Sequence, residues 1–442
     1  MPLAINRGRR PFFALAVSLL FAVTPLFAAI SQIAKIDRLA TEIENQVIAW
    51  RRDVHEHPEL SNREFRTARL VADHLRTLGM EVHTGIAVTG VTGVLRGGRD
   101  GPVVALRADM DALPVTEQTG LPFASTATDE FHGDEVGVMH ACGHDAHVGI
   151  MMGVAQILAA MRDELPGTVK FIFQPAEEGA YPARTWGAKM MVEEGVLKDP
   201  RPDAIFGLHV WAASPAGSIG FRAGPTMASA DYLRITVKGR QTHAAAPWMG
   251  VDPIVVASQI VLALQTIPSR QINVLEAPSI VSIGTIKGGQ RNNIIPDSVE
   301  MTGTIRAFDP VIREKLHEKV RRTAVRIAES AGAEADVTIG IGYPTTVNDP
   351  ALTKLMAPTL RRVAGPGQYY SNPLVTGAED FSYYQEVIPG LYFFLGITTD
   401  DEHLKSAAFN HSPLFTIDES ALLVGVRALS HLAIDFLQAN SP

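Results

Sequence analysis

The 442-residue sequence has little cysteine, no excess of basic residues and few long apolar runs. Its one cysteine, Cys142, cannot form an internal disulfide, which excludes a disulfide-stapled scaffold. Lysine and arginine (39) are outnumbered by aspartate and glutamate (47), and no basic cluster is dense enough to bind a phosphate backbone, so nucleic acid is not an expected partner. After residue 30, no run reaches the roughly 18 apolar residues of a membrane span. We therefore expect a globular protein with a small-molecule or peptide partner.

The first 30 residues differ in composition from the rest of the chain. Arginines within residues 7–10 precede an almost uncharged segment, residues 11–30. This pattern is typical of an export signal and predicts a location in the bacterial periplasm. The paired arginines at 9–10 also resemble the twin-arginine signal. Because Leu26 or Phe27 stands where a small residue is preferred before the cleavage site, an uncleaved N-terminal anchor is the alternative.

Helical and strand-like patterns alternate over residues 31–220. Helices are predicted over residues 33–78, with a break at 57–59, and over residues 148–161. Short apolar strands are predicted at residues 103–106, 169–173 and 204–208. Because strands alternate with helices, we expect an α/β domain in three layers, with a mixed or parallel sheet covered on both faces.

Residues that could bind a metal follow the predicted strands. In open α/β sheets, ligands bind outside the carboxyl ends of the strands. A single carboxylate there is usually solvated, but a thiolate, imidazoles and carboxylates together suit zinc and similar metals. The strand ends and the start of the 148–161 helix carry Asp109, Asp111, Glu177, Glu178, His209, Cys142 and His144. We expect these side chains to converge on one site.

The pattern changes between about residues 221 and 343. Strand, helix, two strands, helix and strand are predicted in the βαββαβ order of a ferredoxin-like domain, at residues 232–237, 253–267, 279–286, 298–307, 310–331 and 335–341. Residues 344–442 then return to helices, a strand at 391–395 and further polar motifs. The 221–343 segment is therefore predicted to be inserted into a catalytic domain formed by residues 31–220 and 344–442.

A series of short motifs runs in order along the chain: residues 55–61 (HEHPELS), 106–114 (LRADMDALP), 139–147 (MHACGHDAH), 174–179 (QPAEEG), 207–209 (GLH), 377–381 (GAEDF) and 411–413 (HSP). Together they resemble the metal-dependent N-acyl-amino-acid amidohydrolases. That group contains hippurate hydrolase and plant hydrolases of indoleacetyl-amino-acid conjugates, within the aminoacylase and zinc carboxypeptidase clan. The resemblance covers essentially the whole chain after the export signal.

The resemblance implies two divalent metal ions, of zinc, manganese, cobalt or nickel. Their ligands would be Cys142, His144, Glu178, His209 and His411, with the thiolate of Cys142 near both ions. Such a pair of ions can acidify a shared water and polarise an amide carbonyl. Glu177 matches the general base of the family, which takes a proton from that water and returns one to the leaving amine.

The resemblance also assigns residues around the metals. His243 matches a histidine that reaches across a homodimer interface to stabilise the oxyanion, which makes the inserted segment a lid and dimerisation domain. Asn293 and Arg306 resemble the pair that binds the substrate carboxylate. Where many relatives follow the His243 motif with Pro-His, this chain has Trp248 after the proline, and we expect an altered pocket mouth or subunit contact.

Some roles stay open at this point. Asp111 either orients a ligand histidine or forms an ion pair with Arg107. Glu379 approaches either the metal site or the substrate amine, or has no role in the reaction. His140 and His147, which flank the ligands, are expected to orient or pack rather than to bind metal.

The resemblance implies hydrolysis of the amide bond of an N-acyl or N-aroyl amino acid, which releases a carboxylic acid and a free amino acid. A metallo-carboxypeptidase or dipeptidase is the alternative, because the clan shares its metal site among these activities. A solute-binding protein without catalysis is the third hypothesis. The adjacent Glu177 and Glu178 argue against it, because a binding protein has no need of a base beside a metal ligand.

Overall fold

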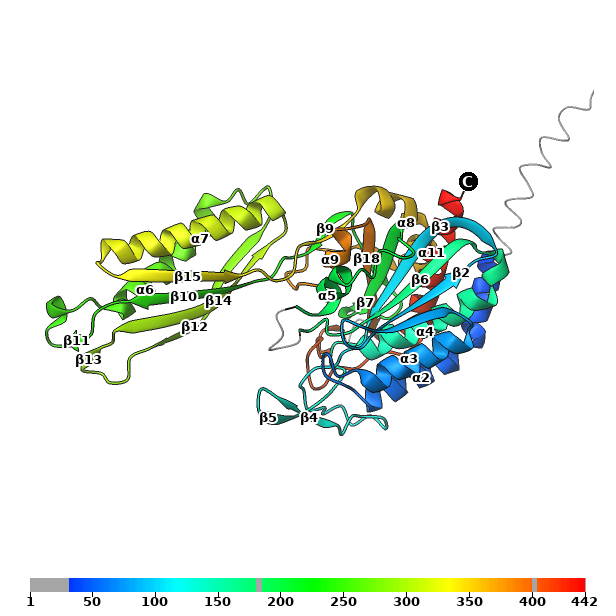
Figure 1. Ribbon diagram of the computed structural model, residues 1–442, viewed down its shortest axis with the longest axis horizontal. Helices are drawn as coiled ribbons and strands as arrows, with labels where there is room; N and C mark the ends of the chain where they lie inside the picture. The colour runs from blue at the N-terminus through cyan, green and yellow to red at the C-terminus, as the bar shows by residue number, and fades with distance from the viewer. Residues whose placement is uncertain (1–31, 180–184, 400–403, 442) are drawn as a thin grey trace, which may run out of the picture.

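The computed structural model describes residues 32–179, 185–399 and 404–441. The predicted export signal and its cleavage site lie outside these residues. The described chain forms a larger part around an eight-stranded sheet and a smaller part around a four-stranded sheet. Two adjacent segments of the chain connect the two parts (Figure 1).

The larger sheet is mixed, as predicted. The strand formed by Arg99–Asp109 is parallel to both of the strands beside it. Antiparallel pairs of strands occur nearer the two edges of the sheet. Its order is β1 (Glu81–Ile86), β2 (Gly90–Arg96), β6 (Pro166–Gln174), β3 (Arg99–Asp109), β7 (Ala204–Pro215), β18 (Gly390–Thr398), β8 (Ile219–Phe221) and β17 (Tyr369–Ser371).

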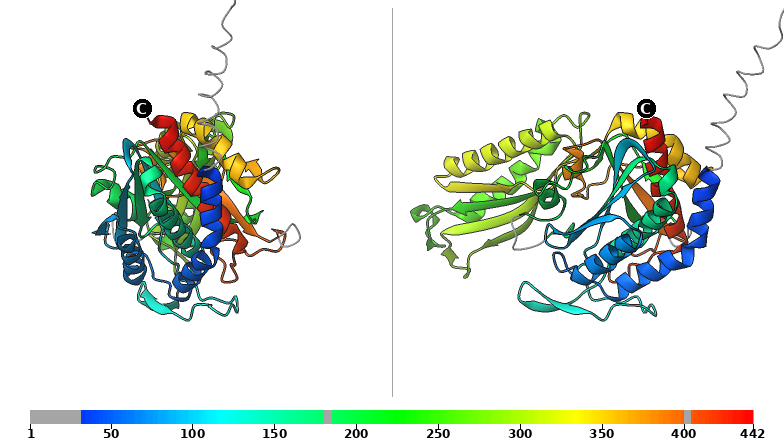
Figure 2. Two further views of the ribbon diagram at one scale, coloured as in Figure 1. Left: turned by 90° about the vertical axis from the view of Figure 1, so that its right-hand side faces the viewer. Right: turned by 45° about the vertical axis from the view of Figure 1, so that its right-hand side comes forward.

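Helices cover both faces of this sheet. One face carries α2 (Glu44–Glu56), α3 (Phe65–Thr77), α4 (His144–Ala160), α8 (Pro350–Ala364) and α11 (Ser420–Asn440), and the other carries α5 (Gly187–Glu193) and α9 (Ser382–Gln385) (Figure 2). Successive strand residues point to opposite faces. Leu106 and Phe206 accordingly join one core, and Ala105 and Ile205 join the other. The three-layer α/β prediction is confirmed.

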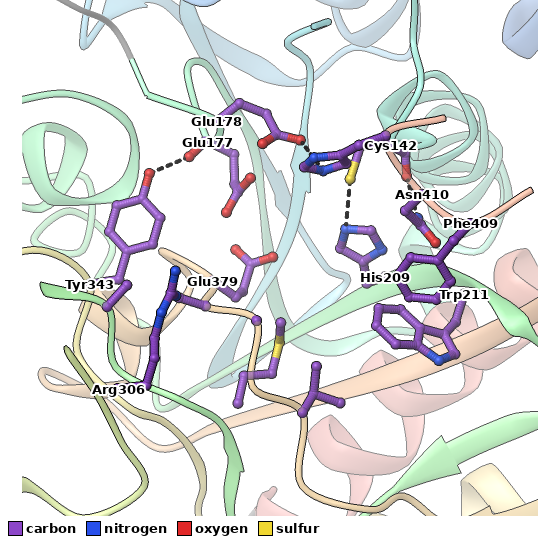
Figure 3. A pocket seen from close by; sticks show the side chains of 16 residues that line it. Cys142, Glu177, Glu178, His209, Trp211, Arg306, Tyr343, Glu379, Phe409 and Asn410 are labelled. Carbon is purple, nitrogen blue, oxygen red and sulfur yellow. Dashed lines mark hydrogen bonds and ion pairs between the residues drawn. The ribbon is translucent and has the colours of Figure 1, made fainter. Parts of the chain in front are cut away.

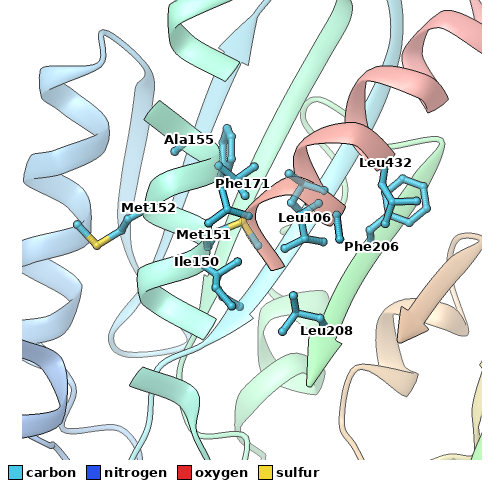
Figure 4. Packing of buried hydrophobic residues seen from close by; sticks show 14 of the residues in the cluster. Leu106, Ile150, Met151, Met152, Ala155, Phe171, Phe206, Leu208 and Leu432 are labelled. Atoms are coloured by element: carbon cyan, nitrogen blue, oxygen red, sulfur yellow. The ribbon is translucent and has the colours of Figure 1, made fainter. Parts of the chain in front are cut away.

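Helix α4 is buried along nearly its whole length, between α2, the sheet and α11 (Figure 4). A Cβ atom on Gly153 would come within 2.8 Å of Val47 on α2, so the glycine permits this close packing. The helix begins at His144, four residues before the predicted start, because Gly143 adopts a left-handed conformation (φ +94°) that turns the chain into it. The rigid first turn of α4 therefore carries His144.

The C-terminal helix α11 is, within the described part of the chain, the one helix with the length and composition to cross a membrane, and 72% of its apolar window is buried inside the protein. It packs against α4 and β3, as a core helix does.

His209 lies inside β7, whereas the sequence placed it after the end of that strand; the predicted boundary is wrong. Strand β7 continues because β18 pairs with it past His209, which lies opposite Phe394. Strand β3 pairs with β7 only as far as Gly207. His209 therefore lies beyond the end of the pairing with β3, at the carboxyl ends of the parallel strands, where the other predicted ligands were expected.

The smaller part has the predicted βαββαβ order. Its sheet is antiparallel, in the order β12 (Ser279–Gly288), β14 (Ser298–Ala307), β10 (Asp231–Lys238) and β15 (Glu334–Gly340). Helices α6 (Pro253–Leu264) and α7 (Pro310–Ser330) pack on it around a separate apolar core. A short pair, β11 (Thr242–His243) and β13 (Ile294–Ile295), forms its outer end (Figure 1). Its limits at residues 221 and 343 and its role as a lid or dimerisation domain stay predictions.

Candidate metal and active site

A cavity of about 430 Å³ opens at the carboxyl ends of the parallel strands of the large sheet, on the side that faces the smaller part (Figure 3). It is lined by Cys142, Glu177, Glu178, His209, Trp211, Met227, Ala230, Arg306, Tyr343, Val375, Gly377, Ala378, Glu379, Phe409, Asn410 and His411. Most of the residues predicted for the metals, the general base and the substrate carboxylate therefore share one cavity.

The five predicted metal ligands fall into overlapping groups. In two of these groups, the potential ligand atoms all lie within 4.8 Å of one another: Cys142, His144 and His209 form one, and Cys142, Glu178 and His411 form the other. Cys142 belongs to both, and its Sγ atom lies 3.4 Å from Nε2 of His209. This arrangement places the thiolate where it could serve two ions.

Two of the ligand histidines, His144 and His209, are each held at Nδ1 by a main-chain oxygen, and Nε2 of His209 faces Cys142. Nδ1 of His144 lies 2.8 Å from the main-chain oxygen of Asp111, and its buried Nε2 has no hydrogen-bond partner among the described residues. Nδ1 of His209 donates to the main-chain oxygen of Val210 at 2.7 Å. Metal-binding histidines are oriented in this way. Together with a thiolate and a carboxylate, these donors fit divalent ions such as zinc.

Asp111 braces the turn that presents the two glutamates. Its carboxylate accepts the backbone N–H groups of Glu177 and Glu178, each at 3.0 Å. The preceding Ala176 has φ +53°, an uncommon backbone conformation for alanine, and its N–H donates to buried Glu64 at 2.9 Å. The two buried carboxylates hold this strained turn in place. The ion pair between Asp111 and Arg107 that the sequence left open does not form.

Burial dominates the electrostatics of the site. It raises the pKa of Glu177 well above its usual range, and Glu379 and Glu178 raise that pKa further. Burial and the Glu178 carboxylate likewise raise the pKa of the Cys142 thiol. Burial lowers the pKa of His209 and keeps its imidazole neutral. Nearby cations would favour the charged forms of Glu177 and Cys142, so the cluster is chemically matched to positive ions.

Both carboxylate oxygens of Glu379 accept hydrogen bonds from other residues of the protein. Its Oε1 atom accepts hydrogen bonds from Arg107 and from the backbone of Phe381, each at 2.9 Å, and its Oε2 accepts one from Tyr392 at 2.7 Å. The buried Arg107 guanidinium also binds Asp109, at 2.6 Å. Glu379 lines the cavity, but these contacts use both of its oxygens.

The two histidines that flank the ligands differ. His147 contacts Asp109 through Nδ1, and its Nε2 accepts the backbone N–H of Val210 at 3.0 Å, so both ring nitrogens are occupied. His140 is buried, and neither of its ring nitrogens has a hydrogen-bond partner in the described structure. Its pKa is lowered to about 3, mainly by burial. Neither belongs to the two groups that share Cys142.

The structure separates the residues predicted to contact substrate. Arg306, on β14, lines the cavity. His243 and Asn293 lie together at the outer end of the smaller part, where the Ala244 N–H donates to the Asn293 main-chain oxygen, and neither lines the cavity. Trp248 is 76% exposed near the same end. Within one chain, His243 and Asn293 do not reach the site, and their roles stay predictions.

Three aromatic residues of the cavity, Trp211, Tyr343 and Phe409, were not predicted from the sequence. The Tyr343 hydroxyl donates to the main-chain oxygen of Glu177 at 2.5 Å, a contact that no local sequence pattern indicates. Trp211 follows the ligand His209 by two residues, and Phe409 precedes the ligand His411 by two. Because β7 continues past His209, the side chains of His209 and Trp211 share one face of the strand; a prediction of the full strand would have indicated Trp211.

This chain is similar to known proteins over most of its length. Residues 105–435 match the model of peptidase family M20/M25/M40. The chain is 42% identical to thermostable carboxypeptidase 1 of Saccharolobus solfataricus, over 91% of this chain and 98% of that protein. It is 38% identical to N-acetyl-L-cysteine deacetylase of Bacillus subtilis, with 90% of each chain covered. The fold matches the crystal structure of Bacillus subtilis YXEP, a dinuclear metal-binding peptidase of the M20 family (TM-score 0.76, 38% identity, 90% of this chain and 99% of that one).

Proposed function

Because this chain belongs to peptidase family M20/M25/M40, we propose that it hydrolyses the amide bond of N-acyl or N-aroyl amino acids with the help of two divalent metal ions. The observation that carries the proposal is a buried glutamate, Glu177, beside the metal-ligand cluster, in a cavity that also contains Arg306. The likeness to a dinuclear metal-binding peptidase supports the two ions. Their identity is left open among zinc, manganese, cobalt and nickel.

The metal-ligand cluster and Glu177 have different roles in the proposed reaction. Ions held by Cys142, His144, Glu178, His209 and His411 would supply an acidified water and polarise the amide carbonyl. Glu177 accepts a proton from the attacking water and delivers one to the leaving nitrogen. Its Oε1 atom receives one long hydrogen bond, from the Asp380 N–H at 3.4 Å, and its Oε2 makes none with the described residues. This carboxylate is therefore free to exchange protons.

Arg306 binds the carboxylate of the substrate in this proposal. It lines the same cavity as the ligand cluster, and none of the described residues forms an ion pair with it. Burial lowers its pKa, but a guanidinium remains charged at neutral pH. A partly desolvated, unpaired guanidinium suits a carboxylate, because it can donate two parallel hydrogen bonds.

A carboxypeptidase or dipeptidase is the second candidate, favoured by the relative named a thermostable carboxypeptidase. A dipeptide brings a free ammonium group, which needs an unoccupied acidic partner in the cavity. Glu379 does not provide one, because Arg107 and Tyr392 already use its oxygens. N-blocked substrates therefore fit this cavity better than dipeptides with a free amine.

We also propose a homodimer in which His243 and Asn293 of one chain complete the site of the other. The outer surface of the smaller part carries exposed apolar residues, including Val255 (53% exposed) and Leu262 (72% exposed) on α6 and Ile286 (56% exposed) on the edge strand β12. Val255 and Leu262 are seven residues apart and so lie on one helix face. Such an apolar helix face beside an open strand edge favours pairing with a second copy of the chain.

Export to the periplasm is proposed from the first 30 residues alone.

Substrate comparison tests the proposed activity. The metal-loaded protein should hydrolyse N-benzoylglycine or N-acetyl amino acids with a higher kcat/KM than dipeptides of the same C-terminal residue. Detection of the released amino acid serves both substrate classes. A higher kcat/KM for dipeptides would replace the proposal by the dipeptidase alternative.

A further inference from the structure

The two ends of the cavity differ in chemistry. Arg306 and Tyr343 lie on one side, and Trp211 and Phe409 lie on the other (Figure 3). The ligands Cys142 and His209 lie near the aromatic pair (Figure 3). A substrate that spans the cavity would therefore meet a cation at one end and aromatic rings at the other.

The aromatic pair is fixed by the ligand segments themselves. Trp211 shares a face of β7 with His209, and their ring centroids are 6.4 Å apart. The rings of Trp211 and Phe409 meet edge to face, with centroids 4.9 Å apart. Behind them, the fully buried Phe394 lies 5.0 Å from Trp211. The position of the pair relative to the ligands is thus set by the same two chain segments.

The pair stays open toward the cavity. Phe409 is 48% exposed, and Trp211 is half-buried although Phe394 packs behind it. Both rings line the cavity. Open aromatic surface in a ligand pocket favours a ring partner, since aromatic contacts add to the free energy gained by burial alone.

We propose that Trp211 and Phe409 form the acyl-group subsite and select aromatic acyl groups, such as benzoyl, over acetyl. This inference rests on the proposed function. With the substrate carboxylate at Arg306 and the scissile carbonyl at the ligand cluster, the acyl group continues toward the aromatic pair. A benzoyl ring is attached directly to the carbonyl carbon and reaches the two side chains, whereas the methyl group of an acetyl substrate leaves them uncovered.

The test compares N-benzoylglycine with N-acetylglycine, which share their amino acid. In Phe409→Ala, kcat/KM for the benzoyl substrate should fall about tenfold, with less than a twofold change for the acetyl substrate. Trp211→Leu should act in the same direction. Tyr369→Ala removes another exposed ring (43% exposed), which does not line the cavity, and should change kcat/KM for neither substrate. An equal loss for both substrates in Phe409→Ala, or no loss, would overturn the subsite.

Binding of benzoate separates this inference from the proposed function. Calorimetry on the metal-loaded protein should give a dissociation constant for benzoate about tenfold higher in Phe409→Ala than in the wild type, with the binding of acetate unchanged. Metal content, measured by elemental analysis, should be the same in both proteins. If the wild type cleaves no N-acyl amino acid, the proposed function fails, and weaker benzoate binding in the variant would still support the subsite. Unchanged benzoate binding would overturn it.

Discussion

The carboxylate of Asp111 accepts the backbone N–H of Glu178 at 3.0 Å. Its other oxygen holds the N–H of Glu177, and its main-chain oxygen lies 2.8 Å from Nδ1 of His144. One buried residue thus positions the general base and two metal ligands that come from different elements. The positions of these three residues therefore depend on Asp111.

Asp111→Asn should weaken metal binding. The amide nitrogen of asparagine is a donor, so it cannot accept the second backbone N–H and would leave it unpaired in the interior. We expect the metal affinity to fall about 10- to 100-fold, with a parallel loss of activity at limiting metal. Metal titration followed by elemental analysis measures this. Asp73→Asn, at an exposed ion pair with Arg76, is the control, and equal metal affinities in the two variants would contradict the role of Asp111.

Arg107→Met should destabilise the protein strongly. The guanidinium is fully buried among Asp109, Glu379 and Asp380, and its removal leaves uncompensated carboxylates in the interior. Loss of one partner from such a cluster costs about 3–5 kcal/mol of unfolding free energy. Urea denaturation provides the measurement. Arg96→Met, which breaks an exposed pair with Glu81, should leave the midpoint unchanged, and similar midpoints for both variants would contradict the prediction.

Asp231 should stabilise the protein in a pH-dependent manner. Although burial opposes its ionisation, hydrogen bonds from Arg313 and His317 lower its pKa from 3.8 to about 2. A lowered carboxyl pKa adds stability that is complete above the unfolded pKa and is lost as the pH falls toward 2. The difference in unfolding free energy between wild type and Asp231→Asn should therefore shrink by about 1–2 kcal/mol between pH 7 and pH 3. A difference that stays constant over this range would contradict the assignment.

Mixed dimers test the assignment of His243 to the neighbouring site. His243→Ala and Glu177→Gln should each be nearly inactive alone. After subunit exchange, heterodimers contain one site with both residues intact, so an equimolar mixture should regain about a quarter of the wild-type activity. Sedimentation should show dimers in all samples. Activity that does not recover in exchanged dimers would contradict a role for His243 across the interface.

The sequence predicted the elements better than their ends. Hydrophobic patterns predicted all four strands of the smaller sheet, but only β3, β6, β7 and β18 of the eight strands of the large sheet. The position of His209 inside β7 depends on pairing with β18, which lies far away in the chain, and no local pattern reports such pairing.

For the candidate site, the sequence likewise predicted the metal-ligand cluster better than the contacts around it. The ligand motifs marked the cluster, and the structure brings those side chains together. The partner of Arg107 was not decided by the motif, because Asp109 and Asp111 both follow it at even spacing. In the structure, β3 ends at Asp109, which pairs with Arg107, and Asp111 lies beyond the strand. The contribution of Phe409 depends on a loop that meets β7 only in the folded protein.

The most direct test of the account is turnover by Glu177→Gln. Glutamine has the size of glutamate but cannot accept the proton, so kcat for an N-acyl amino acid should fall about 10²- to 10⁴-fold. Metal content by elemental analysis and the affinity for benzoate should remain those of the wild type. Turnover that persists at the wild-type level, with both metals bound, would contradict the central claim that Glu177 is the base of a metal-dependent amide hydrolase.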